Sequence, residues 1–233
     1  MKTIFQNALK ILIFFISIVS YSQWSDGGGR VNMTDEYELI TTIGFTEIDN
    51  ASKEVVGSSY INENFLRAHI TNKKMVYSMR YNAYRDEMEI ELEGKPFYLP
   101  KTSYYAINFD FPDKEYQLFN FEEKGETKKG FFVVISKNGA TSLLLKEKIK
   151  LYKEVPAKLG FTRYEPPKLG RLDDKIYIGT NQEAVELPKK KKDILNFFND
   201  KSKDLESYAK KNKYSFNKTE DLIKIISYYN SMN

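Results

Sequence analysis

The sequence predicts a mainly β protein, an antiparallel sheet that is rolled or sandwiched, with a small α-helical tail at the C-terminus. Two observations support this prediction. From Phe65 to Glu154, short runs rich in Val, Ile, Tyr and Phe, such as "YAINFDF" and "FFVVIS", alternate with polar or glycine-bearing breaks. After Pro188 the spacing of apolar residues changes from about two to nearly four, which is typical of amphipathic helices.

The N-terminus has the features of a secretory signal peptide. Lys2 and Lys10 precede the apolar run "ILIFFISIVSY", and Ser20 and Ser22 are the small residues that a signal-peptidase site requires. The apolar run has about ten residues, whereas a membrane-spanning helix needs about 20. We therefore expect cleavage after Ser22, export of the protein, and Gln23 as the first mature residue.

Three further regions follow the signal peptide of residues 1–22. Residues 23–36, "QWSDGGGRVNMTDE", are polar and glycine-rich, which indicates a flexible lead-in. Residues 37–187 carry the strand pattern and form the predicted antiparallel β domain, although its first segment, "YELITTIGFTEI", fits either a strand or a short helix. Residues 188–233 form the lysine-rich helical tail, with 11 lysines against 6 acidic residues.

Turn signals divide the β domain. "EGKP" and "KNGA" are the clearest hairpin turns, because Asn138-Gly139 is a pair that tight primed turns prefer. Residues 155–174 contain three prolines and two glycines, so we expect a surface excursion there. "KIYIGTNQEAVELP" predicts one more hairpin after it.

The tail carries three short apolar stripes at helical spacing. The third is preceded by "NKTE" (Asn217–Glu220), which has the spacing of a capping box. The residues of the three stripes are Ile194, Leu195, Phe197 and Phe198, then Leu205, Tyr208 and Ala209, then Leu222, Ile225, Ile226 and Tyr229.

Composition excludes several classes of site. The chain has no cysteine, so it has no disulfide, no thiolate metal site and no lipid anchor of the bacterial lipoprotein type. His69 is the only histidine, which excludes a multi-histidine zinc site, and we interpret it as an ordinary strand residue. No cofactor motif is present. The net charge of +4 is concentrated in the tail, but an exported protein seldom meets nucleic acid, so we expect no nucleic-acid partner.

The acidic stretch "VYSMRYNAYRDEMEIELE" (Val76–Glu93) is the clearest candidate for chemistry. On a strand its glutamates share one face and its apolar residues the other, which predicts a solvated acidic face opposite Lys or Arg on a neighbouring strand. Two alternatives remain open. The carboxylates are also suitable ligands for calcium, or Glu89 or Glu91 is one of the two carboxylates of a glycoside hydrolase.

The segment "YNAYRD" within this stretch is turn-like, polar and aromatic. It predicts an exposed recognition loop between two strands, and the candidate binding residues are Tyr81, Asn82, Tyr84, Arg85 and Asp86. The alternative interpretation is a plain hairpin connection.

Three segments together resemble a recurrent type of uncharacterised exported β-rich protein of Bacteroidetes, particularly flavobacteria. They are "GSSYINENF", "MRYNAYRDEMEIE" and "FFVVISKNGATSLLLKEK", followed by the lysine-rich tail. The resemblance covers most of residues 57–230 and implies an envelope location and a single β-rich body, with no known catalytic residues. The helical C-terminus differs from the β-sandwich sorting domain of type IX secretion substrates, which favours the periplasm over release.

Together these features predict a non-enzymatic cell-envelope protein that binds a partner protein or a surface component such as a glycan, without a cofactor. The alternatives are an envelope glycan hydrolase that uses a strand carboxylate, and a calcium or small-ligand binding module. A further alternative makes the lysine-rich helices a dock for another envelope protein. No segment of the mature chain has the length of a transmembrane helix.

Overall fold

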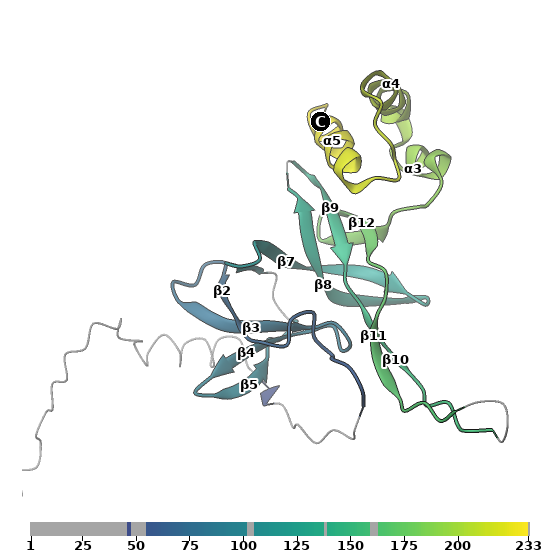
Figure 1. The fold of residues 1–233 in the computed structure, drawn as a ribbon. Coiled ribbons are helices and arrows are strands. Elements are labelled where there is room, and N and C mark those ends of the chain that lie inside the picture. The colour runs from purple at the N-terminus through teal and green to yellow at the C-terminus, as the bar shows by residue number, and fades with distance from the viewer. Residues whose placement is uncertain (1–45, 48–54, 102–104, 138, 159–162, 233) are drawn as a thin grey trace, which may run out of the picture. The chain divides into compact units, whose positions relative to one another are not determined.

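The computed structural model describes residues 46–47, 55–101, 105–137, 139–158 and 163–232. The protein is mainly β with helices at the C-terminus, which confirms the predicted fold class (Figure 1). The signal peptide of residues 1–22, its cleavage site at Ser22 and Gln23, and the lead-in of residues 23–36 lie outside the described residues. So does the segment 37–48, apart from the two residues of β1.

The first half of the described chain forms an open antiparallel sheet. Its strands follow the order β1-β5-β4-β3-β2-β6-β7, and each pairs antiparallel with its neighbours. In chain order the strands are β1 (Thr46–Glu47), β2 (Leu66–Ile70), β3 (Val76–Asn82), β4 (Glu87–Leu92), β5 (Lys95–Tyr98), β6 (Ala106–Phe109) and β7 (Lys114–Glu123).

A closed five-stranded barrel follows, and it begins with the same β7. Four pairs along the barrel are antiparallel, so the first and fifth strands run in the same direction and the closing pair, β13 with β7, is parallel. The sheet is thus rolled, as predicted. After β7 the barrel strands are β8 (Glu126–Ser136), β9 (Thr141–Lys146), β12 (Lys175–Thr180) and β13 (Glu183–Glu186).

β7 joins the two parts because both of its edges and both of its faces are used. β8 lies along one edge, whereas β6 and β13 share the other. Tyr116 and Leu118 belong to the core of the open sheet. Phe119 and Phe121, on the opposite face, pack with Phe132 in the barrel core. Side chains alternate along a strand, so one ten-residue strand contributes to two cores.

Three hairpins turn through two residues that both have positive φ, as primed turns require. These turns are Glu93-Gly94, Lys124-Gly125 and Asn181-Gln182. The first confirms the hairpin predicted at "EGKP", and the third confirms the hairpin predicted at "KIYIGTNQEAVELP". The hairpin predicted at "KNGA" is confirmed as the β8–β9 connection, but four residues (137–140) separate the strands, and Asn138 lies outside the described residues.

A two-stranded ribbon interrupts the barrel between β9 and β12. It consists of β10 (Ile149–Tyr152) and β11 (Lys168–Arg171), which pair antiparallel (Figure 1). The prediction of a surface excursion over residues 155–174 holds in that most of its described residues are exposed, but it missed β11. The prolines did not prevent pairing, because Pro166 and Pro167 precede the strand instead of interrupting it.

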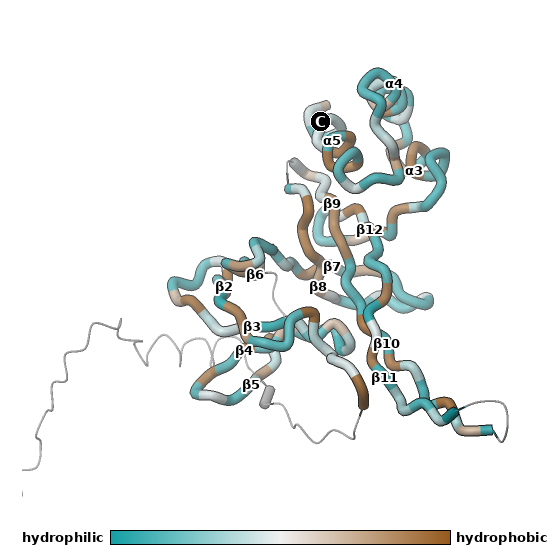
Figure 2. Tube along the Cα trace, viewed as in Figure 1, coloured by the Kyte–Doolittle hydropathy of each residue, from teal (hydrophilic) through white to brown (hydrophobic). Residues whose placement is uncertain are grey.

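Three α-helices follow Pro188, as predicted: α3 (Lys191–Phe197), α4 (Ser202–Asn212) and α5 (Thr219–Asn230), with the 3₁₀ turn η1 (Asn199–Lys201) between the first two. Their apolar faces share one core with Leu143 of β9 and Ile178 of β12, on the outside of the barrel. Hydrophobic positions of β9 and α5 are brown in Figure 2.

The N-terminus of α5 differs from the prediction. The predicted capping box is wrong, because Lys218 is the N-cap of α5 and makes no side-chain cap hydrogen bond. Asp221 instead accepts a hydrogen bond from the backbone N–H of Ser215 at 2.9 Å.

Among the described residues, no helix is long and apolar enough to cross a membrane.

We predict that the helices and the barrel unfold together. Ile225 of α5 is fully buried in the shared core, so Ile225→Ala should lower the free energy of unfolding by about 2–5 kcal/mol. Amide exchange should accelerate in β9 as well as in α5. The half-exposed Val185→Ala is the control and should change stability by about 0.5 kcal/mol or less. Faster exchange confined to α5 would show that the tail folds independently.

Candidate functional site

The β3–β4 connection is held to the barrel by the carboxylate of Asp86. Asp86 Oδ1 accepts hydrogen bonds from the Tyr81 hydroxyl at 2.7 Å, the Lys146 ammonium at 2.7 Å and the backbone N–H of Phe131 at 3.1 Å. Lys101 Nζ lies 3.7 Å from Asp86 Oδ2. A carboxylate with this many donors fixes the connection against β8 and β9.

Lys146 is the buried cation of this arrangement. Its ammonium also donates to the Phe131 carbonyl at 2.8 Å and lies 4.6 Å from the centre of the Phe132 ring. Burial lowers the pKa of Lys146, while Asp86 opposes that shift. Gly130 leaves the necessary space, because a Cβ there would lie 2.4 Å from Asp86 Oδ2 and 2.7 Å from Lys146 Nζ.

The structure separates the five predicted binding residues into two groups. Tyr81 and Asn82 are buried, so the prediction of one exposed recognition loop is wrong for them. The Asn82 carboxamide oxygen accepts from the backbone N–H of Arg85 at 3.0 Å, which shapes the turn. Tyr84 and Arg85 are exposed, and Asp86 is partly buried. The connection is therefore a structured hairpin turn that presents two of the five side chains to solvent.

The acidic face of β4 is not uniformly solvated. Glu91 and Glu93 are exposed as predicted, but Glu89 has no exposed surface, which corrects the prediction for that residue. The predicted basic partner is present, because Arg80 stands opposite Glu89 in the register and donates from Nε at 2.8 Å. The Tyr60 hydroxyl and the Asn82 amide also donate to Glu89, at 3.1 and 3.2 Å.

Arg80 itself is held on both sides. Its guanidinium carbon lies 3.8 Å from the centre of the Tyr60 ring and 4.2 Å from that of Phe65. The stacked cation and two further donors enclose the Glu89 carboxylate, so it has a structural role and is not presented to a substrate.

Two adjoining cavities lie where strands end at one end of the barrel. Their volumes are about 690 and 200 Å³, and we call them together the barrel-end cleft. The larger cavity extends to the start of the ribbon at Leu151 and to Tyr177 of β12. The β3–β4 turn, β7, β9 and the β9–β10 connection provide the walls that both cavities share. The shared residues are Tyr84, Phe121, Glu123, Lys146 and Lys148.

The smaller cavity of the barrel-end cleft has an excess of positive charge. Its lining comprises six cations and three acids: Arg85, Lys101, Lys128, Lys129, Lys146 and Lys148, against Asp86, Glu123 and Glu147. Two of these groups are also paired with residues outside the lining. Glu147 accepts hydrogen bonds from Lys114 and Arg171 at 3.0 and 2.9 Å, and Lys101 Nζ lies 3.2 Å from Glu87 Oε1. Hydrogen bonds from Lys148 and Lys128 lower the pKa of Glu123. The cavity therefore attracts anions.

Three of the five predicted binding residues line this cleft, and the rest of its lining was not among the candidates from the sequence. Arg85 and Asp86 line the smaller cavity and Tyr84 lines both, whereas the lysines of β8 and β9 were not predicted. One sequence signal was available. Lys146 lies two residues after Leu144, so it has the parity of a barrel-core residue on β9, and a charged residue at such a position is unusual.

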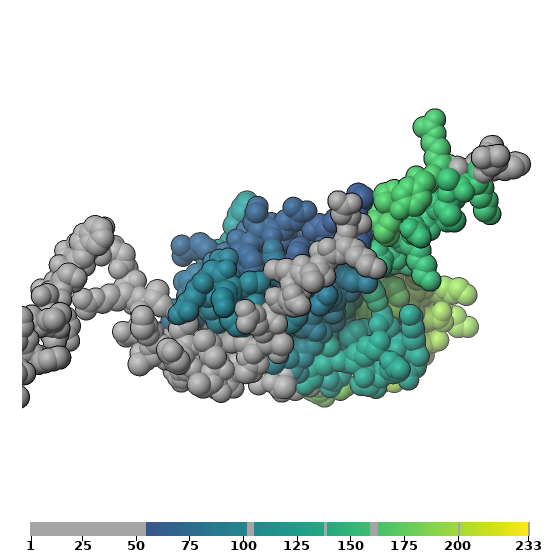
Figure 3. All heavy atoms as spheres, turned by 90° about the horizontal axis from the view of Figure 1, so that it is seen from below, coloured from purple at the N-terminus to yellow at the C-terminus, as the bar shows by residue number. Residues whose placement is uncertain are grey.

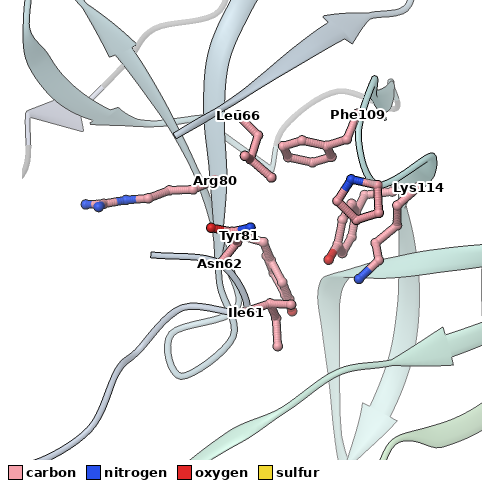
Figure 4. A pocket seen from close by; sticks show the side chains of 9 residues that line it. Ile61, Asn62, Leu66, Arg80, Tyr81, Phe109 and Lys114 are labelled. Carbon is pink, nitrogen blue, oxygen red and sulfur yellow. The ribbon is translucent and has the colours of Figure 1, made fainter. Parts of the chain in front are cut away.

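A separate, apolar pocket of about 130 Å³ lies beside β3 and β7. In Figure 4, Leu66 and Phe109 point toward one another, whereas Arg80 points away from them. Tyr81 also lines this pocket, and its ring centre lies 4.9 Å from that of Tyr116. The lining is mostly hydrocarbon, so it suits only a small apolar group.

The remaining candidates from the sequence are the single histidine and a metal site formed by carboxylates. His69 Nε2 lies 3.0 Å from Asp110 Oδ1, and both side chains are substantially exposed on the open sheet. Within the part of the chain that the structure describes, no three His, Asp or Glu side chains are grouped to hold a metal ion.

Comparisons of the chain with protein-family models, with curated proteins and with solved structures found no match. The barrel-end cleft is accordingly interpreted from its own chemistry.

We predict that Glu89 is a structural carboxylate. Glu89→Ala leaves Arg80 stacked without its buried partner and should destabilise the protein by about 3–5 kcal/mol in urea unfolding. Glu91→Ala, two residues away on the same strand but exposed, is the matched control and should cost about 0.5 kcal/mol or less. Similar small effects for both variants would contradict the enclosed ion pair.

We also predict cooperative unfolding at alkaline pH. Burial raises the pKa of Tyr60 and Tyr177 from 10.0 to about 12. The unfolded chain releases these protons near pH 10, so the stabilisation is complete below pH 10 and is lost between pH 10 and about 12. Tyrosinate absorbance and circular dichroism should change together in this window. In Tyr177→Phe both changes should occur at a higher pH. Gradual ionisation with unchanged circular dichroism would contradict the prediction.

Proposed function

We propose that this protein is a non-enzymatic binding protein of the cell envelope, and that its barrel-end cleft binds an anionic group of a surface component, such as the carboxylate or sulfate of an acidic glycan. The observation that supports it most is the smaller cavity, whose lining contains six cations and three acids. The signal peptide predicted from the sequence supports export.

The size and walls of the cleft suit a sugar. Its larger cavity, about 690 Å³, lies within the usual range of small-molecule sites, which is about 300–1,000 Å³. Tyr84 is exposed and Tyr177 is buried below the surface, so the wall offers an aromatic face together with polar groups. A ring with an acidic substituent would lie against Tyr84 and direct its charge into the smaller cavity.

The arrangement of carboxylates favours binding over hydrolysis. Glycoside hydrolysis requires two carboxyl groups that flank the scissile bond. Glu89 is enclosed by Arg80, Tyr60 and Asn82, and the exposed Glu91 lines neither cavity of the cleft. Two acids that line one or both of the cavities are held by lysines, because Asp86 accepts a hydrogen bond from Lys146 and Glu123 accepts one from Lys148.

The proposal predicts selective binding of an acidic sugar. Isothermal titration of residues 23–233 should detect binding of galacturonate and none of galactose. Lys128→Ala combined with Lys148→Ala should weaken galacturonate binding by about tenfold or more, because Glu123 is then left to repel the anion. Both lysine side chains are more than 40% exposed, so the fold should tolerate the change.

The control is Lys203→Ala combined with Lys211→Ala on α4, which removes the same charge from an exposed helix. It should leave galacturonate binding unchanged. Equal affinity for galactose, or loss of binding in the α4 control, would show that the cleft does not select an anion. No binding of either sugar would remove the acidic glycan as the ligand and leave a protein partner as the better hypothesis.

A further inference from the structure

The β10–β11 ribbon carries an unusual share of the exposed apolar surface. We define the arm as residues 149–158 and 163–171. Ten large hydrophobic side chains are exposed among the described residues. Four of them belong to the arm, and a fifth, Val56, pairs with Lys168 of β11. The four are Leu151, Tyr152, Val155 and Tyr164. In Figure 3 much of this segment, in green, stands clear of its neighbours.

Apolar side chains project from both faces of the arm. Leu151 stands opposite Leu169, and Val155 shares their face because it lies four residues along the same extended chain. Tyr152 lies on the other face, against Gly170. Tyr164 is on that second face too, since its hydroxyl donates to Glu154 at 3.4 Å. A two-stranded ribbon is only marginally stable alone. Ile149 and Leu169 pack into the core of the open sheet, whereas most described residues beyond them, 150–158 and 163–168, are exposed.

The same segment is basic. Between residues 150 and 168 its described part carries five cations and two acids: Lys150, Lys153, Lys158, Arg163 and Lys168, against Glu154 and Glu165. Both acids have partners within the arm, because Glu154 accepts from Tyr164 and Glu165 lies 3.7 Å from Lys168. The arm therefore presents apolar and aromatic side chains in a positive field.

We propose that the arm docks onto an anionic lipid surface. Charge complementarity indicates an anionic partner, and the two apolar faces favour a bilayer over a protein, because the flat surface of a protein covers only one face. Tyrosine prefers the interfacial region of a membrane, where lysine side chains reach outward to the headgroups. Water is present at that depth, so the edges of the ribbon that Val56 does not pair with keep hydrogen-bonding partners.

Vesicle flotation of residues 23–233 tests this docking. The probes are vesicles of phosphatidylcholine alone and of phosphatidylcholine mixed equally with phosphatidylglycerol. We expect binding to the mixed vesicles only, and weaker binding as salt is added. We test two variants, a charge variant (Lys153→Gln, Arg163→Gln and Lys168→Gln) and an apolar variant (Val155→Ser and Tyr164→Ser). The affinity of each variant for the mixed vesicles should fall by about tenfold or more.

The choice of variants distinguishes membrane docking by the arm from ligand binding in the barrel-end cleft and from membrane binding by the lysines near α3. None of the five substituted residues lines the barrel-end cleft, so galacturonate titration should be unchanged in both variants. The matched control, Lys189→Gln, Lys190→Gln and Lys192→Gln, removes three exposed charges near the start of α3 and should bind vesicles normally.

Three results would overturn the inference. The first is absence of binding to the mixed vesicles, or equal binding to phosphatidylcholine alone. The second is loss of binding in the α3 control with normal binding in the arm variants. The third is a dimer of the native chain, measured by analytical ultracentrifugation, that the apolar variant converts to monomer, because the occupant of the arm would then be a second copy.

Discussion

The membership of β7 in two sheets is the constraint on which the rest of the structure depends. Its outer edge is divided between β6 and β13, and its two faces supply the core of the open sheet and the core of the barrel. Neither part has a complete core without it. The parallel closure onto β13 follows from the odd number of strands, and the helices then cover Leu143 and Ile178 on the far side of the barrel.

A second connection between the two parts is polar. Asp86, at the end of the β3–β4 turn, reaches across to Lys146 and to the backbone of Phe131. Burying these charges is tolerable only because each has several partners, and Gly130 provides the room. The barrel-end cleft lies beside this connection, so the same pair that joins the turn to the barrel also forms one wall of the proposed binding site.

The β3–β4 turn was visible in the sequence, but most of the cleft was not. The alternation of side chains on β4 predicted a solvent-exposed acidic face. This prediction was right for Glu91 and wrong for Glu89, because the pattern of a strand does not show which other segment of the chain covers that strand. Here Tyr60, which pairs with Asn82, covers that position. Lys128, Lys129 and Lys146 of the cleft come from β8 and β9, and only the closure of the barrel brings them near Tyr84.

By itself the sequence determined the β class, the hairpins at Glu93-Gly94 and at Asn181-Gln182, and the three C-terminal helices, because these depend on local periodicity and turn chemistry. Tertiary structure decided the rest. The closed barrel requires pairing between β7 and β13, which lie some 60 residues apart, as in the pair Asn120 and Glu183. The burial of Glu89 beneath Tyr60 and the cation-rich cleft follow from such long-range contacts, which no local pattern encodes.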